Sequence, residues 1–430
     1  MLIDFTVENF RSFADTQTFS MIASKDASHE TSFVERGAFR LLKTAAIYGA
    51  NASGKSNLVK ALMFVDRFVE ESATKMNLGD PISGVEPFRL SRQWRTKPST
   101  FAIRLLINGT EYQYGFSATR ERVHKEWLHV KREGGRVVPA LSREYDAGKD
   151  KTEWHTRGEL KEQAKAAIKA TRDNGLFLSQ AAQVNVEFVK ELFLWFRLHL
   201  WYADLSGPPV GLVQNTAKRI SEDEGFRERV ERLTHDADLG INKLAVGKEA
   251  MSFDGMPEEI RDWLSRMPKA VEKERYRVRT VHLDQDLGEP VEFSLEQDES
   301  EGTQRFFAIV GPIVNALDEG SLMVLDELDC SIHPLLTRKL IELFQSNEAN
   351  PNGAQLIFAT HDSTLMNASL LRRDQIWLCE KNSKEATDLF SLCDIERTPR
   401  KREALENNYL AGRYGGVPRF GPALEDYEVR

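Results

Sequence analysis

The spacing of apolar residues changes along the chain between the period of a strand and that of a helix. The N-terminal part contains both patterns. Residues 2–20 alternate loosely between apolar and polar positions, which predicts two short strands. Residues 21–43 are polar and irregular, which predicts a loop. A short apolar run at residues 45–48 then leads into a helical pattern that continues to about Glu71.

A strand-rich region follows this first helix. Residues 72–85 contain several turn formers and predict a loop. Residues 86–143 predict strands with charges on alternate positions, and Asn108-Gly109 between two of these runs is a strong hairpin signal. The sequence therefore predicts an antiparallel β subdomain.

The middle of the chain is predominantly helical in pattern. Apolar residues recur at near-helical spacing from about Arg157 to Leu200, and Ser206-Gly207-Pro208-Pro209 ends this stretch. Charged helices are expected at about 215–234 and 257–273, and no heptad pattern is long enough for a long coiled coil. An aromatic stripe has two interpretations, a base-stacking platform and the simpler one of core packing; it comprises Phe188, Phe193, Trp195, Phe196 and Trp201.

The C-terminal part predicts a second α/β block. Residues 277–295 suggest two strands around a turn at Gly288. The block from Glu299 to Leu392 predicts, in order, a helix, a strand at 322–325, a helix, a strand at 355–359, a helix, and a strand pair at 375–379 and 388–392. We therefore expect an N-terminal lobe at 1–150, a helical insertion at 151–276, a C-terminal lobe at 277–395 and a tail at 396–430.

Composition narrows the class of protein. The 430 residues are 41% hydrophobic and carry a net charge of −8, which suits a protein with a large core and disfavours one coated by nucleic acid. No apolar run reaches the length of a membrane span, and the N-terminus lacks a signal-peptide pattern. The three cysteines show no C-x-x-C spacing, so we expect neither disulfides nor zinc, and a cytoplasmic location.

Residues Gly49–Ser56 match the phosphate-binding P-loop template G-x-x-x-x-G-K-[ST] in full, between an apolar strand and a helix. The glycines let successive N–H groups point at phosphate oxygens, and the helix that begins near Gly54 adds its positive dipole end. Lys55 is expected to reach the β- and γ-phosphates of ATP, and the Ser56 hydroxyl to ligate Mg²⁺. The predicted nucleotide-binding residues of this loop are Gly49, Asn51, Ala52, Ser53, Gly54, Lys55, Ser56 and Asn57.

Two later strands end in residues that complete a hydrolytic site. The apolar run 322–325 is followed by Asp326 and Glu327 at the carboxyl edge of the predicted sheet, where ligands bind in α/β folds. Asp326 is expected to hold Mg²⁺, and Glu327 to act as general base toward the attacking water. The strand 355–359 leads to His361, which we expect to contact the γ-phosphate or the catalytic water.

A third phosphate-binding element is predicted at residues 300–304. Ser300 can cap the helix that opens there, and Gly302 allows a phosphate to approach the backbone closely. Taken locally, this stretch is only a helix N-cap. Its position before the acid-ended strand favours the functional interpretation.

The order of these motifs resembles an ATPase of the ABC superfamily, with Ser300–Gln304 as a degenerate signature motif and Leu328-Asp329 as the D-loop. Val7–Phe13 resembles the start of SMC and RecF heads and of the overcoming-lysogenisation-defect ATPases. The stretches Asp326–Pro334 and Tyr409–Pro418 resemble a narrower group, the compact AAA-family ATPases of abortive-infection and phage-defence operons. The resemblance implies an ABC-type P-loop ATPase head with an antiparallel β subdomain and a helical insertion.

The resemblance also implies a head-to-tail homodimer. ATP and Mg²⁺ would lie between Lys55, Ser56 and Asp326 of one copy and Ser300 and Gly302 of the other. The signature lacks the usual leucine and second glycine, and we assign no Q-loop glutamine. We expect no nuclease activity in this chain, and a separate effector such as a toprim-like nuclease as its partner.

Two rival functions remain open at this point. One is a RecF-like DNA-repair ATPase that clamps DNA, and the other is a nucleotide-bound assembly scaffold. Two basic clusters each allow two interpretations. Either cluster could line a surface that faces DNA or a partner, or, more simply, it is a charged face exposed to solvent. These clusters are Arg397, Arg400, Lys401 and Arg402, and Arg120, Arg122, Lys125, Lys131, Arg132 and Arg136.

Overall fold

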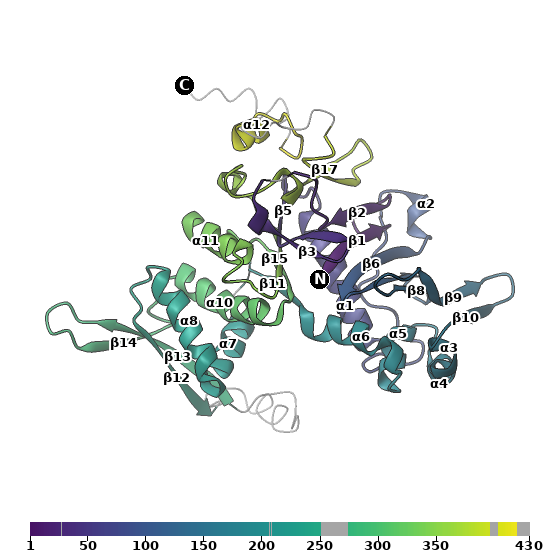
Figure 1. Ribbon diagram of the computed structural model, residues 1–430, viewed down its shortest axis with the longest axis horizontal. Coiled ribbons are helices and arrows are strands. Elements are labelled where there is room, and N and C mark those ends of the chain that lie inside the picture. Colours follow the sequence, from purple (N-terminus) through teal and green to yellow (C-terminus); the bar gives the residue numbers. More distant parts are fainter. Residues whose placement is uncertain (27, 206, 208, 251–273, 396–402, 419–430) are drawn as a thin grey trace. The chain divides into compact units, whose positions relative to one another are not determined.

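The computed structural model describes the chain except for residues 27, 206, 208, 251–273, 396–402 and 419–430 (Figure 1). The chain forms two units. Unit 1 comprises Met1–Asp204, Ala316–Asp329 and Thr337–Arg430. Unit 2 comprises Leu205–Asn315 and Cys330–Leu336.

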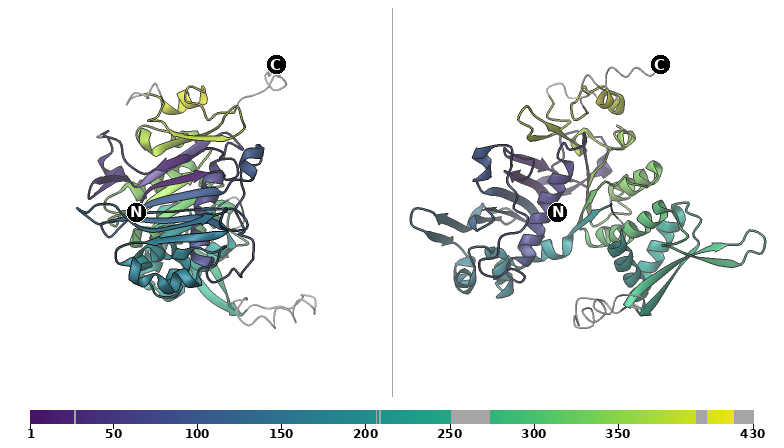
Figure 2. Two further views of the ribbon diagram at one scale, coloured as in Figure 1. Left: turned by 90° about the vertical axis from the view of Figure 1, so that its right-hand side faces the viewer. Right: turned by 180° about the vertical axis from the view of Figure 1, so that it is seen from behind.

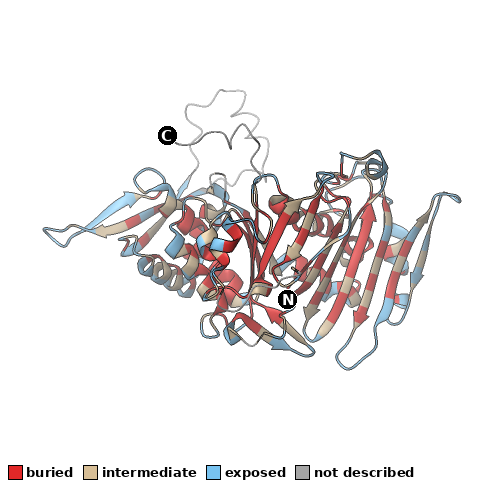
Figure 3. Ribbon diagram, turned by 90° about the horizontal axis from the view of Figure 1, so that it is seen from above, coloured by how far each residue is buried: buried red, intermediate tan, exposed pale blue. Residues whose placement is uncertain are grey.

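A six-stranded sheet carries the P-loop in unit 1. Its strand order is β11-β15-β16-β5-β17-β18, and all neighbouring strands run parallel except the antiparallel pair β17 and β18. The central strands are continuous apolar runs and are buried along their whole length, as expected for parallel strands covered on both faces (Figure 3). The strands are β5 Thr44–Gly49, β11 Leu200–Asp204, β15 Leu322–Asp326, β16 Gln355–Ala359, β17 Ile376–Lys381 and β18 Thr387–Ser391.

A seven-stranded antiparallel sheet forms the other layer of unit 1. Its order is β10-β9-β8-β7-β6-β1-β2. The predicted hairpin is confirmed, because Asn108 and Gly109 join β6 to β7 with φ angles of 48° and 78°, as a tight turn of this type requires. The strands are β1 Leu2–Glu8, β2 Gln17–Ser20, β6 Ser99–Ile107, β7 Thr110–Ala118, β8 Val123–Lys131, β9 Val138–Asp146 and β10 Lys151–Thr156.

Helix α1, Lys55–Glu71, contacts β1, β5 and β15, and its apolar side belongs to the core that joins the two sheets. Helices α3 to α6 lie beside the antiparallel sheet (Figure 2). Phe193, Trp195 and Phe196 of α6 are buried in this core, so the core-packing interpretation of the aromatic stripe is confirmed for them. The helices are α2 Arg92–Arg95, α3 Leu160–Gln163, α4 Lys165–Ala170, α5 Phe177–Gln183, α6 Glu187–His199 and α12 Leu405–Leu410.

Unit 2 contains helices and a three-stranded antiparallel sheet of order β12-β13-β14. The predicted strand pair around Gly288 is confirmed as β13 and β14. Two of the helices, α10 and α11, continue into unit 1. The elements are α7 Val210–Glu222, α8 Glu224–Asp236, β12 Lys243–Ala250, β13 Glu274–Leu283, β14 Pro290–Ser294, α10 Glu301–Glu319 and α11 Pro334–Gln345.

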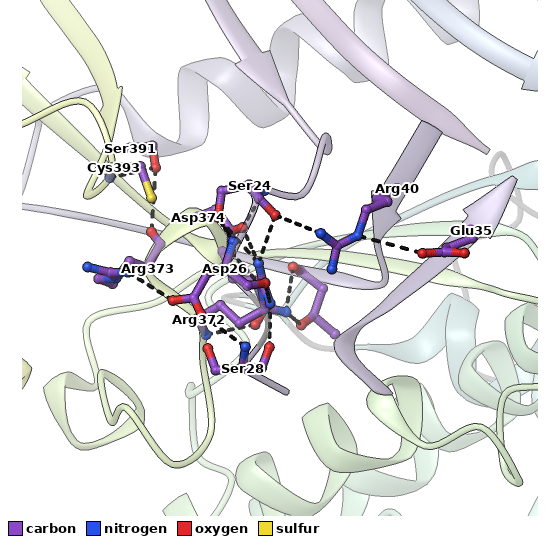
Figure 4. A network of polar contacts seen from close by, with 12 residues as sticks. Ser24, Asp26, Ser28, Glu35, Arg40, Arg372, Arg373, Asp374, Ser391 and Cys393 are labelled. Atoms are coloured by element: carbon purple, nitrogen blue, oxygen red, sulfur yellow. Dashed lines mark hydrogen bonds and ion pairs between the residues drawn. The ribbon is translucent and has the colours of Figure 1, made fainter. Parts of the chain in front are cut away.

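The prediction of a loop at residues 21–43 is wrong for its second half. Phe33–Arg36 and Phe39–Leu42 pair as strands β3 and β4. Buried Arg372 fixes the preceding stretch by donating to the backbone carbonyls of Asp26, at 2.9 Å, and Ser28, while its Nη2 bonds the Asp374 carboxylate at 2.7 Å (Figure 4). These partners come from the far end of the chain, so no local pattern could have predicted them.

Three further elements differ from the predictions. The helix predicted to continue to about Leu200 ends at His199. Residues Leu200–Asp204 form β11 instead, because they pair with β15. The charged stretch 215–234 is divided into α7 and α8 at Asp223, whose side chain accepts the N–H of Phe226 and caps α8. The helix expected after β16 is absent from the described residues there, which contain only the short 3₁₀ turns Ser363–Leu365 and Arg373–Gln375.

The basic cluster that follows β7 consists largely of ion-paired residues. Arg122, Lys125, Lys131 and Arg132 pair respectively with Asp173, Glu144, Glu111 and Glu159. This pairing favours the interpretation as a solvated face. The second cluster, at 397–402, lies outside the described residues, as does the predicted helix at 257–273. In the part of the chain that the structure describes, no helix combines the length and apolarity needed to cross a membrane.

Candidate functional site

The P-loop connects the buried strand β5 to α1 at the carboxyl edge of the six-stranded sheet. Gly54 precedes α1 with a φ of 119°, and a Cβ at this position would collide with Thr387 and Ser12. These two residues also brace the loop, because the Thr387 hydroxyl donates to the Ser53 carbonyl at 2.6 Å and forms a hydroxyl–hydroxyl hydrogen bond with Ser12 Oγ at 2.8 Å. The loop is therefore held in shape by β18 and by the N-terminal segment.

The remaining predicted P-loop residues differ in exposure. Asn51 and Ala52 are exposed, and Ala52 has a positive φ of 62°. Ser53 is buried, and its Oγ has no hydrogen-bond partner among the described residues. Asn57, in the first turn of α1, donates from Nδ2 to Ser12 Oγ at 2.8 Å. This bond ties the predicted N-terminal motif to the helix that follows the P-loop.

Lys55 is buried beneath its own loop. Its Nζ donates to the carbonyls of Gly49 at 2.8 Å and of Ala50 at 3.4 Å. Burial lowers the pKa of Lys55, while the nearby thiol of Cys379 and the carboxylate of Asp326 oppose this shift. The position of this ammonium is compatible with phosphate oxygens replacing the two carbonyl oxygens as its hydrogen-bond acceptors.

Ser56 and Asp326 meet although they come from different parts of the sequence. Asp326 is the last residue of β15 and is only 4% exposed. Burial raises the pKa of Asp326, and a hydrogen bond from Ser56 opposes the shift. Asp326 Oδ1 has no hydrogen-bond partner among the described residues. A buried carboxylate oxygen in this state fits a cation ligand.

These two residues fit Mg²⁺ in particular. The described residues contain no cluster of three or more His, Cys, Asp or Glu that could hold a metal by themselves. Mg²⁺ in nucleotide sites typically uses one or two carboxylates together with phosphate oxygens and waters. Ser56 and Asp326 would hold it, and the ion would neutralise charge on the phosphate oxygens.

Glu327 and His361 follow two adjacent parallel strands, β15 and β16, and so lie at the same edge of the sheet. Glu327 has a φ of 58°, which turns the chain immediately after the strand. His361 is exposed, and its backbone N–H donates to Asp329 Oδ2 at 3.2 Å. Partial desolvation and then the charge of Lys55 lower the pKa of His361 below its ordinary value of 6.5, which favours the neutral imidazole at pH 7.

Asp204 is a site candidate that the sequence reasoning missed. It ends β11 and stands opposite Asp326 in the register of the two parallel strands. Its charge contributes to the raised pKa of Asp326, after burial, which is the main cause. The sequence gives only a weak indication of this role for Asp204. Residues 200–204 continue an apolar helical pattern, and only pairing with β15 makes them a strand.

Ser300 and Gly302 belong to unit 2, whereas the P-loop, Asp326 and His361 belong to unit 1. The expected cap is present: Ser300 Oγ accepts the N–H of Thr303 at 3.2 Å at the start of α10. A Cβ on Gly302 would lie 2.7 Å from the carbonyl oxygen of Ser331. Packing within unit 2 is therefore sufficient to require this glycine.

Comparison with known families gives a match over most of the chain. The family model described as "AAA domain, putative AbiEii toxin, Type IV TA system" matches residues 45–367, which contain the P-loop, Asp326, Glu327 and His361. No curated protein matches the chain.

Solved structures that resemble this one include an SMC head domain and a RecF protein. The SMC head domain from Thermotoga maritima is 13% identical, with a TM-score of 0.39, over 91% of this chain and 98% of that chain. The recombination mediator protein RecF of the RecFOR pathway, with ATP, is 14% identical, with a TM-score of 0.33, over 90% of this chain and 97% of that chain.

Proposed function

This chain belongs to the AAA-domain family of the AbiEii type, and from that premise we propose that it is an ATP-hydrolysing switch of an anti-phage system. The observation that carries the ATPase part is the Ser56–Asp326 pair beside the buried Lys55. This set supplies a cation for phosphate, a hydroxyl and a carboxylate for Mg²⁺, and a sheet edge where two strands place Glu327 and His361.

The chain's own residues would divide the work of hydrolysis. Backbone N–H groups of the P-loop and Lys55 would bind the β- and γ-phosphates. Glu327 would accept a proton from water as the water oxygen bonds the γ-phosphorus and the bond to the β-phosphate oxygen breaks, which leaves ADP and inorganic phosphate. Neutral His361 would donate a hydrogen bond to the γ-phosphate or hold the water.

The switching part of the proposal is a head-to-tail homodimer. The N-terminus of α10, capped by Ser300, would face the γ-phosphate bound by a second copy. ATP would then close the dimer and hydrolysis would open it. The closed dimer would control a separate effector, such as a toprim-like nuclease, in keeping with the toxin–antitoxin description of the family.

A Glu327→Gln variant tests this proposal. It keeps the shape of the side chain but cannot accept the proton, so it should bind ATP, lose turnover and accumulate in the closed state. We expect its mass in light scattering to double with ATP and Mg²⁺ and to remain unchanged with ADP. Undiminished turnover would contradict the role of Glu327, and a monomer under both conditions would contradict dimerisation by ATP alone. Glu348→Gln, an exposed site, is the matched control.

A further inference from the structure

A pocket of about 590 Å³ lies beside the P-loop, on the side away from Asp326. It is lined by the P-loop residues Ala50, Asn51 and Ser53, by the end of β17 and its turn into β18, and by Gly416–Pro418. All of these residues belong to unit 1. The volume is within the range of roughly 300–1,000 Å³ that is usual for small-molecule sites.

Ser53 provides an independent sign of a ligand. Its side chain is 3% exposed and lines the pocket, and its Oγ has no hydrogen-bond partner among the described residues. Leaving a buried hydroxyl unpaired costs free energy in the folded protein. A polar ligand atom in the pocket would remove that cost.

The chemistry of the lining suits a nucleoside better than a phosphate. Its polar side chains include the acids Glu380, Glu385 and Asp388, and its basic residue Lys381 donates to the Glu385 carbonyl at 2.7 Å. Carboxylates repel phosphate but accept hydrogen bonds from ribose hydroxyls and from the exocyclic amine of a base. A final group of apolar side chains can pack against the base, namely Phe390, Val417 and Pro418.

The C-terminal side of the pocket is attached directly to the P-loop. The Tyr409 hydroxyl donates to the Gly416 carbonyl at 3.2 Å and accepts the backbone N–H of Gly49. Gly415 has a φ of +78°, and a Cβ on it would lie 2.5 Å from Glu380 Oε2. The stretch Tyr409–Pro418, which the P-loop and the hydrolytic residues do not explain, is thus shaped to contact both the loop and β17.

We propose that the base and ribose of the nucleotide occupy this pocket while its phosphates bind the P-loop. Residues 409–418 then form the C-terminal wall of the nucleoside site. The inference rests on the proposed ATP site and adds to it the residues that recognise the nucleoside.

Pocket-filling variants test this inference in the full-length chain. Ser383 lines the pocket from the exposed turn between β17 and β18, so Ser383→Trp fills it with little effect on folding, and Val417→Trp fills it from the C-terminal side. Lys384→Trp is the matched control, because Lys384 is exposed in the same turn and does not line the pocket. Calorimetry would compare ATP with inorganic tripolyphosphate, which has no nucleoside, and circular dichroism would verify folding.

The pocket variants should affect the binding of ATP but not that of tripolyphosphate. Ser383→Trp and Val417→Trp should weaken ATP binding by about 10-fold or more, which is a loss of about 1.4 kcal/mol, and leave tripolyphosphate binding within about twofold. Lys384→Trp should change neither. Unchanged ATP binding by both folded pocket variants, or equal weakening of both ligands, would overturn this inference alone. A wild-type chain that binds neither ligand would overturn the proposed ATP site as well.

Discussion

The hydroxyl of Ser56 donates a hydrogen bond to the carboxylate of Asp326, and this bond joins the first turn of α1 to the carboxyl end of β15. The second carboxylate oxygen, Oδ1, is buried without a partner among the described residues. The protein therefore maintains an ionisable group in an unfavourable environment at the place where a nucleotide-bound cation would lie. This arrangement is typical of a site that trades stability for ligand binding.

We expect Asp326→Asn to stabilise the nucleotide-free protein. Burial raises the pKa of Asp326 above its ordinary value, and above that raised pKa the folded state must hold an ionised carboxylate that burial disfavours. The neutral amide removes this cost at pH 7–8, so the free energy of unfolding should rise by about 0.5–2 kcal/mol. The increase in Tm produced by ATP and Mg²⁺ should disappear. Asp15→Asn, at an exposed site, should change neither, and an undiminished Mg²⁺–ATP effect in Asp326→Asn would contradict the metal role.

Lys55→Ala should abolish detectable nucleotide binding. The variant loses the buried ammonium that bonds the Gly49 carbonyl and that we expect to bond phosphate. Charge-assisted hydrogen bonds contribute about 1.5–3 kcal/mol each, so the loss of bonds to both the β- and the γ-phosphate should lower ATP affinity by about 10²- to 10⁴-fold. Calorimetry would measure the ATP affinity, with Lys75→Ala, exposed in the turn that follows the same helix, as control. Tight ATP binding by Lys55→Ala would disprove the P-loop assignment.

His361→Ala should slow hydrolysis while ATP binding is largely kept. Removal of one donor aimed at transition-state charge costs about 10²- to 10³-fold in kcat. Because the pKa of His361 is lowered below its ordinary value of 6.5, any loss of turnover through protonation of the imidazole should appear below pH 7 rather than between pH 7 and pH 8. Single-turnover kinetics and calorimetry would separate the two steps, with exposed His155→Ala as control. A binding defect without a change in the chemical step would refute the assigned role.

Asp204→Asn should weaken the response to Mg²⁺ rather than the fold. Asp204 stands opposite Asp326 in the paired strands and is exposed, so its replacement leaves the core intact. We expect the Mg²⁺ concentration for half-maximal turnover to rise by about 10- to 100-fold, as for residues that support a metal ligand. Thermal unfolding without nucleotide should match the wild type within about 0.5 kcal/mol. An unchanged Mg²⁺ dependence would exclude Asp204 from the site.

Asp66 on α1 should make stability depend on pH. Burial, and then the charge of Glu70, raises the pKa of Asp66 from 3.8 to about 8. Between these values the folded state binds a proton that the unfolded state releases, so the free energy of unfolding falls as pH rises, by up to about 1.4 kcal/mol per pH unit. Asp66→Asn should lack this fall in urea unfolding at pH 6, 7 and 8. A variant that keeps the wild-type slope would assign the dependence to another group.

The parts of the fold and of the candidate site that sequence patterns predicted are those encoded by contiguous residues. Gly49–Ser56 specifies a turn and a helix start through its own glycines and flanking elements. The apolar strand before Asp326 and the Asn108-Gly109 hairpin are likewise complete within a few residues. Such segments have one favoured local structure, which the tertiary fold preserves.

The sequence by itself determined that this chain has a P-loop, an acid-ended strand and a histidine-ended strand in the order of an AAA-family ATPase. Only the tertiary structure decided that residues 200–204 form a strand that brings Asp204 beside Asp326, and that Tyr409 bonds Gly49. The physical reason is the same in both cases. Strand pairing and side-chain contacts between distant residues draw their free energy from packing against partners, and no local period encodes which partner will be chosen.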